Sequence, residues 1–92
     1  MDLNLKVIVN RDLKYVFIDQ DLIILGRQEK QYFSLNEVGT KIWCLLQTQT
    51  HSVYELSEKI FQTYEVSKAQ CQIDIIKFIK EMMQHQLILK VH

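Results

Sequence analysis

The hydrophobic pattern of the chain changes its period once, at Asn36. Before this residue, apolar side chains alternate with polar ones or form short runs, as they do in β-strands. After it, apolar residues recur every three or four positions, as they do on one face of an amphipathic helix. Strands followed by helices predict an α+β fold, in which a small antiparallel sheet packs against a cluster of helices.

The part before Asn36 predicts a three- to four-stranded antiparallel sheet. Residues 13–18, 22–25 and 31–35 are rich in β-branched and aromatic side chains and are separated by "DQD" at 19–21 and by Gly26 with "RQEK". Residues 3–9 alternate in the same way and are predicted as a further strand, whose membership of the main sheet is left open. The C-terminal segment "LILKV" at 87–91 fits either a short strand or an extended tail.

The part after Asn36 predicts three helices, each with a start signal. Asn36 is a good N-cap, and "SVYE" at 52–55 and "SKAQ" at 67–70 fit the capping box. The predicted buried stripe of the last helix consists of Cys71, Ile75, Phe78, Ile79 and Met82. Helices joined by short turns beside a β-hairpin are the parts of a winged helix-turn-helix, which binds either DNA or protein.

The composition excludes several classes of protein. A chain of 92 residues is expected to form one domain, residues 1–92. Apolar runs such as Leu22 to Leu25 are far too short to cross a membrane, and the N-terminus does not have the pattern of a signal peptide, so a cytoplasmic location is expected. Eleven basic residues balance eleven acidic ones, and only two are arginines, which argues against a nucleic-acid partner.

No set of residues in the sequence is typical of an enzyme. There is no nucleophile elbow, no phosphate-binding glycine loop and no cysteine or histidine spacing of a zinc site, so neither a metal nor a cofactor is expected. Asp19 and Asp21 are interpreted as turn residues. Cys44 and Cys71 lie in helical patterns and are predicted to be buried thiols.

The strand at Gln31 to Leu35 is a candidate binding edge, because it runs directly into a helix and not into another strand. The outer edge of a sheet carries unpaired N–H and C=O groups, which another extended chain is able to pair with. The alternative is that the C-terminal strand or tail covers this edge.

The order of motifs resembles the PqqD family, whose members recognise leader peptides in pathways of peptide natural products. The resemblance is carried by "YFSLNEVGTKIWCLL", "SVYELSEKI", "YEVS" and "DIIKFIKEMMQHQLI", and covers roughly residues 13–89. The matching positions are Leu35, Asn36, Gly39, Ile42, Trp43, Leu56, Asp74, Phe78 and Leu87. Gln86 stands where the family pattern has glycine.

The resemblance implies a non-catalytic, winged-helix-like domain that binds the leader of a ribosomally made precursor peptide. It implies that the leader adds as a strand to Gln31 to Leu35 and lies in a groove against the last helix, Ala69 to Met83. The domain would present the leader to a modifying enzyme, either the leader peptidase of a lasso-peptide pathway or a radical-SAM enzyme, as in the synthesis of pyrroloquinoline quinone. Since the sequence starts at Met1 and is short, a free-standing member is expected.

Helical geometry suggests which residues of the last helix line that groove. Beside the core stripe, Ile76 and Met83 fall on one flank, while Asp74 and Lys77 fall on the other side. Ile76 and Met83 either line a pocket or widen the buried stripe, and Asp74 either holds a leader cation or N–H group or belongs to a solvated face. The predicted peptide-binding residues are Gln31, Tyr32, Phe33, Ser34, Leu35, Asp74, Ile76, Lys77 and Met83.

Two other functions remain open at this point. A winged-helix regulator would place its last helix in the major groove of DNA through Gln70, Lys77 and Lys80. A structural subunit would use its strand edge to dimerise.

Overall fold

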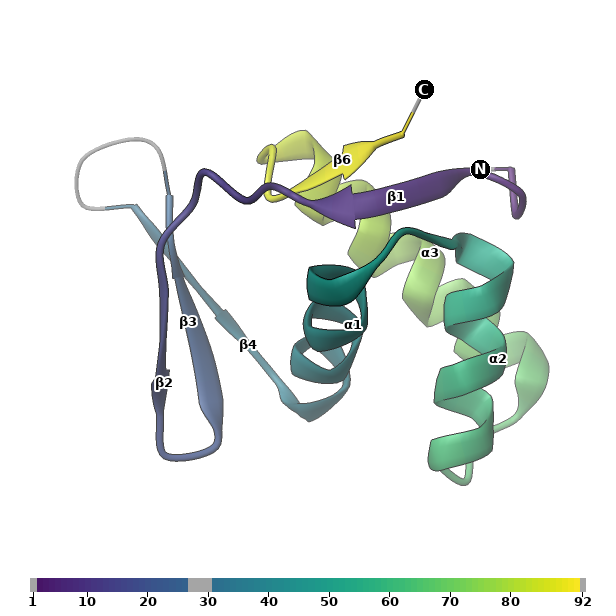
Figure 1. Cartoon of the computed structure of the whole chain (residues 1–92). Coiled ribbons are helices and arrows are strands. Elements are labelled where there is room, and N and C mark those ends of the chain that lie inside the picture. The colour runs from purple at the N-terminus through teal and green to yellow at the C-terminus, as the bar shows by residue number, and fades with distance from the viewer. Residues whose placement is uncertain (1, 27–30, 92) are drawn as a thin grey trace.

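The computed structural model describes residues 2–26 and 31–91 and confirms the predicted α+β class (Figure 1). The loop predicted at 27–30 lies outside the described residues. In chain order the elements are β1 (Lys6–Val9), β2 (Tyr15–Ile18), β3 (Asp21–Leu25), β4 (Tyr32–Leu35), α1 (Glu37–Thr48), β5 (His51–Ser52), α2 (Val53–Thr63), α3 (Lys68–Gln84) and β6 (Ile88–Lys90).

The strands form two antiparallel sheets of three strands. One has the order β2-β3-β4 and is called here the hairpin sheet; the other has the order β5-β1-β6. The strand predicted within residues 3–9 is therefore not part of the main sheet, because β1 pairs with β5 and with β6, Val7 lying opposite Lys90. Figure 1 shows the hairpin sheet to one side of the helices, with β1 and β6 lying across their ends.

The helices begin at the predicted residues. The Asn36 side chain accepts a hydrogen bond from the Gly39 amide at 2.8 Å, and the capping box of Ser52 and Glu55 is complete. Ser67 also caps its helix, but the predicted capping box at 67–70 is only half formed. The Gln70 side chain donates to Asp74 at 2.8 Å and does not reach back to Ser67. These local signals therefore place all three helix starts.

The core lies between the helices and the inner faces of the two sheets. Trp43 is only 1% exposed, as its place beside the first helical stripe predicts, and Cys71 is buried. Cys44 was predicted to be buried and this was wrong: it is exposed, because it lies on the side of α1 opposite the buried Ile42 and Leu46. No helix in the described part of the chain is long and apolar enough to cross a bilayer.

The end of α3 explains how Gln86 replaces the family glycine. Gln86 has φ of 61°, in the left-handed region that glycine occupies most easily. Its amide donates to the Met83 carbonyl, and the Leu87 amide donates to the Met82 carbonyl, which together make a Schellman motif. The chain thus keeps the turn and accepts a strained residue in it.

Candidate peptide-binding site

The strand β4 is an edge of the hairpin sheet. It pairs with β3 on one side, and no strand among the described residues pairs with its other side. The C-terminal segment does form a strand, but β6 pairs with β1 in the other sheet. The alternative in which that segment covers the edge is therefore wrong.

Two residues of β4 turn their backbone groups to the open edge. The amide of Gly26 donates to the carbonyl of Gln31 at 2.8 Å, so Gln31 faces β3. Because an antiparallel strand turns its backbone groups alternately to its two neighbours, the residues two and four positions further on also face β3. Tyr32 and Ser34 lie between them, so their N–H and C=O groups point outward. The edge offers two donors and two acceptors to an added strand.

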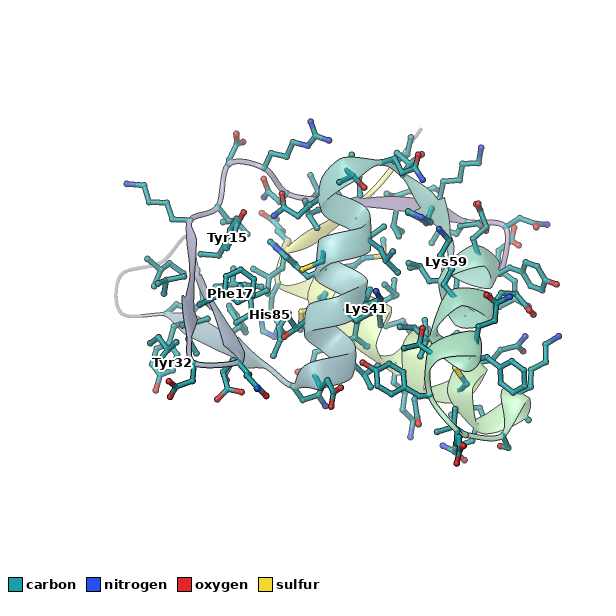
Figure 2. The ribbon with its side chains drawn as sticks, turned by 60° about the horizontal axis from the view of Figure 1, so that its bottom comes forward. Tyr15, Phe17, Tyr32, Lys41, Lys59 and His85 are labelled. Atoms are coloured by element: carbon teal, nitrogen blue, oxygen red, sulfur yellow. The ribbon has the colours of Figure 1, made fainter. Side chains whose placement is uncertain are left out.

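The side chains of β4 divide between the two faces of the sheet. Tyr32 is 67% exposed and Ser34 is exposed on the outer face, whereas Leu35 is buried and Phe33 is half-buried on the face toward the helices. The rings of Phe33 and His85 lie 4.8 Å apart between centroids. Since His85 caps the C-terminal end of α3, this contact brings the end of α3 beside β4; Figure 2 shows His85 next to the hairpin sheet.

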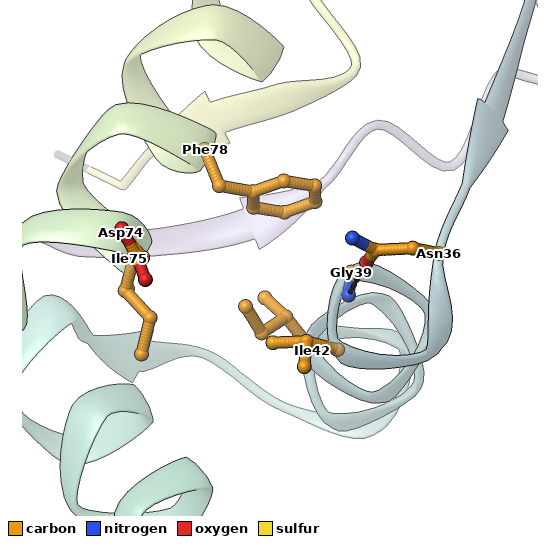
Figure 3. A pocket seen from close by; sticks show the side chains of 7 residues that line it. Asn36, Gly39, Ile42, Asp74, Ile75 and Phe78 are labelled. Atoms are coloured by element: carbon orange, nitrogen blue, oxygen red, sulfur yellow. Dashed lines mark hydrogen bonds between the residues drawn. The ribbon is translucent and has the colours of Figure 1, made fainter. Parts of the chain in front are cut away.

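A pocket of about 230 Å³ opens where β4 passes into α1. Figure 3 shows Asp74 and Phe78 of α3 facing the first turns of α1 across it. Its floor is apolar and its rim is polar; the lining residues are Asn36, Val38, Gly39, Ile42, Asp74, Ile75 and Phe78. An extended chain on β4 would reach this pocket directly, since Asn36 follows the last residue of the strand.

Gly39 fixes how closely the two helices approach at this pocket. A Cβ atom on Gly39 would lie 3.0 Å from the Phe78 ring and 3.4 Å from the Leu35 Cβ atom. A larger residue would push the ring aside or fill the space, so glycine allows Phe78 to form the wall of the pocket. This close approach gives a physical reason for both family-matching positions.

A smaller cavity of about 60 Å³ continues from this pocket and shares Val38, Asp74 and Ile75 with it. It reaches Tyr64, whose hydroxyl donates to the Glu37 carboxylate at 3.4 Å. Burial of the phenol, with the charge and hydrogen bond of Glu37 as smaller causes, raises the pKa of Tyr64. Tyr64 therefore stays neutral and supplies an apolar ring to the wall.

The structure brings together only part of the predicted site on α3. Asp74 lies at the pocket rim, and its carboxylate accepts a hydrogen bond from Gln70. Ile76 and Met83 are half-buried and pack against the core, on the flank of α3 away from Asp74. Lys77 is exposed and does not line the pocket.

Sequence reasoning missed two residues at this site, Phe78 and His85. Phe78 was assigned to the buried stripe, but it stands at the edge of that stripe and is half-buried. Its match to the family pattern was the available signal. His85 carried no signal, because its contact with Phe33 joins residues far apart in the chain.

Comparison with known proteins identifies a family and a fold for the chain. Residues 21–88 match the family model of coenzyme PQQ synthesis protein D (PqqD), and no curated protein gives a significant match. The fold is similar to that of TbiB1 in complex with the TbiA(beta) leader peptide, with 25% identity, a TM-score of 0.76 and coverage of 88% of this chain and 93% of that chain. It is also similar to that of lasso peptide synthetase B1 complexed with the leader peptide, with 18% identity, a TM-score of 0.76 and coverage of 90% and 96%.

Proposed function

Because the chain belongs to the PqqD family, we propose that it binds the leader of a ribosomally made precursor peptide and holds it for a modifying enzyme. The observation that carries the proposal is the open edge of β4 beside the pocket between α1 and α3. A complex with a leader peptide, the state in which TbiB1 was solved, is consistent with this role.

In this proposal the leader adds to β4 as an antiparallel strand. Tyr32 and Ser34 exchange about four hydrogen bonds with it, each stabilising by ~0.5–1.5 kcal/mol. Its inward side chains meet the face that carries Phe33 and the end of α3. The preceding part of the leader reaches the pocket, because an antiparallel chain enters at the α1 end of β4.

The energies suit a carrier that must release its cargo. Two apolar anchors in the pocket and along α3 would add ~1.5–3 kcal/mol each. The whole gain is then about 5–12 kcal/mol, of which association and ordering of the leader consume a large part. Affinities from micromolar to high nanomolar are expected.

Specificity has to come from side chains, because backbone pairing is nearly blind to sequence. We propose that Phe78 and the floor of the pocket accept an apolar leader side chain, and that the Asp74 carboxylate accepts a hydrogen bond from a leader cation or N–H group at the rim. Tyr32 is placed to contact the leader from the outer face of the sheet.

A matched pair of variants tests which flank of α3 is used. Phe78 and Ile76 are both half-buried on the same helix but lie on opposite flanks. Phe78→Ala is expected to weaken leader binding more than its loss of stability explains, whereas Ile76→Ala affects stability alone. The reverse result would place the groove on the flank of Ile76 and Met83.

For the enzyme that receives the leader, we propose the leader peptidase of a lasso-peptide pathway, with the chain as a non-catalytic, cytoplasmic partner. A solved protein of this fold is a lasso peptide synthetase B1. A radical-SAM enzyme is the alternative within the family. A pull-down distinguishes the two enzymes. The purified chain is mixed with a tagged leader peptidase or a tagged radical-SAM enzyme from the same locus, and the enzyme that retains it is its partner.

The function is tested by binding and by amide hydrogen exchange. Fluorescence anisotropy at moderate salt compares the labelled leader from the same locus, a scrambled leader and duplex DNA. Only the true leader is expected to bind, and amide protection is expected at residues 31–35 and along α3. Salt-sensitive binding of DNA without any response to the leader would instead identify a winged-helix regulator.

A further inference from the structure

The hairpin sheet has a second open edge, at β2. Among the described residues no strand pairs with the outer side of β2. All four of its residues, Tyr15 to Ile18, are apolar or aromatic and are between 45% and 57% exposed. A short, uncharged strand exposed on both faces and along one edge is typical of a surface that pairs with another strand.

The backbone groups that face this edge are fixed by the pairing with β3. The amide of Leu25 donates to the carbonyl of Lys14 at 2.8 Å, so Lys14 faces β3. Alternation along the strand gives Val16 and Ile18 the same direction. The N–H and C=O groups of Tyr15 and Phe17 therefore point outward, away from the sheet.

This arrangement is complementary to itself. We propose that β2 pairs antiparallel with β2 of a second copy of the chain, about a two-fold axis at Val16. Tyr15 then lies opposite Phe17 of the second copy, and each such pair exchanges two hydrogen bonds, so that all outward-facing groups of both residues are satisfied. The two hairpin sheets become one six-stranded sheet.

The side chains and charges fit the same register. Tyr15 and Phe17 already pack edge to face within one copy, with ring centroids 6.1 Å apart, and the dimer adds cross-strand aromatic pairs on this face. Lys14 at one end of β2 comes near the acidic hairpin of the second copy, which carries Asp19 and Asp21. The symmetry makes this attraction twice.

The size of the contact predicts a weak dimer. Two four-residue strands bury less than the ~800 Å² per partner of a standard stable interface, so exchange with monomer at micromolar concentrations is expected. The β4 edges remain at the two outer ends of the six-stranded sheet. Each dimer would therefore carry two independent leader sites.

Introducing a charge at Val16, the residue on the proposed two-fold axis, tests the proposal. Sedimentation velocity over a range of concentrations measures the self-association. In the proposed dimer Val16 lies directly opposite Val16 of the second copy. Val16→Lys and Val16→Glu each place like charges opposite one another and are therefore expected to weaken self-association by at least about tenfold. An equal mixture of the two variants should restore dimer as a heterodimer. A wild-type chain that stays monomeric, or a mixture that does not associate, overturns the proposal.

Two control variants locate the contact. Leu25→Lys changes an exposed residue of the same outer face away from the axis, and Tyr32→Lys changes the β4 edge; both should dimerise as the wild type does. A dimer that resists Val16→Lys but is lost in Tyr32→Lys would place the contact at β4 and contradict the proposal. Leader binding by Val16→Lys should be unchanged, so that this test and the test of leader binding fail independently.

Discussion

Replacing Ser34 by proline tests the direction of the β4 backbone. Ser34 presents its N–H group to the open edge and its side chain to solvent. Proline removes that N–H group and leaves the hydrogen bonds between β4 and β3 in place. The residue before proline must be extended, which Phe33 already is as part of the strand.

The expected loss of affinity follows from one missing donor. The leader carbonyl that would accept from Ser34 is left unpaired between two strands, at a cost of about 1–3 kcal/mol. This corresponds to a rise in Kd of about 5- to 150-fold. The pyrrolidine ring also occupies part of the space of the incoming strand, so the upper end of this range is expected.

Fluorescence anisotropy with labelled leader measures the effect, and thermal unfolding checks that the fold persists. Ser34→Ala keeps the N–H group and should bind as the wild type does. Phe17→Pro makes the same backbone change at the opposite edge of the sheet and should leave leader affinity unchanged. Wild-type affinity in a folded Ser34→Pro variant would refute the docking of the leader on β4.

Three further predictions concern stability. Trp43→Ala should cost about 3–5 kcal/mol in urea unfolding, because the indole is buried against the core; a variant with wild-type stability that loses the leader would instead make Trp43 a contact residue. Gln86→Gly should raise stability by about 0.5–1 kcal/mol, since glycine adopts φ of 61° without strain, and a lowered melting temperature would show that the glutamine contributes more than its strain costs. The backbone N–H and then the hydroxyl of Ser52 lower the pKa of Glu55, so the capping box stabilises the fold above the ordinary value of 4.5 and this stability is lost as pH falls through the lowered pKa. Ser52→Ala should cost about 0.5–2 kcal/mol at neutral pH, and Glu55→Gln, which has no carboxylate to titrate, should reduce the acid dependence of unfolding; an unchanged pH profile in Glu55→Gln would contradict this role.

The predictions from sequence succeeded where the signal is local. Asn36 and Ser52 predict helix starts through hydrogen bonds to residues only three positions further on, and both caps are present. The division into two sheets could not be predicted, because Val7 pairs with Lys90 near the other end of the chain. Alternation shows that a segment is a strand, but the partner of a strand is decided by packing across the whole molecule.

The same limit applies to the site. A helical wheel gives the flanks of α3 correctly, with Ile76 on one and Asp74 on the other, but it does not say which flank meets β4. That choice depends on the contact of Phe33 with His85 and on the approach of Gly39 to Phe78. Both contacts join residues that are far apart in sequence. The sequence pattern therefore predicted the open edge at β4 but not the residues of α3 that lie beside it.

The two edges of the hairpin sheet explain why a leader would select β4. Each edge presents two outward-facing residues, so backbone pairing alone does not distinguish them. At β4 the end of α3 and the pocket lie beside the strand and are able to recognise the side chains of one particular peptide. At β2 the exposed residues are apolar or aromatic, and Lys14 lies at one end of the strand with Asp19 and Asp21 at the other, which favours an antiparallel second copy. In the two proposals, the side chains around each edge, and not the strands themselves, would therefore select different partners for the two edges of one small sheet.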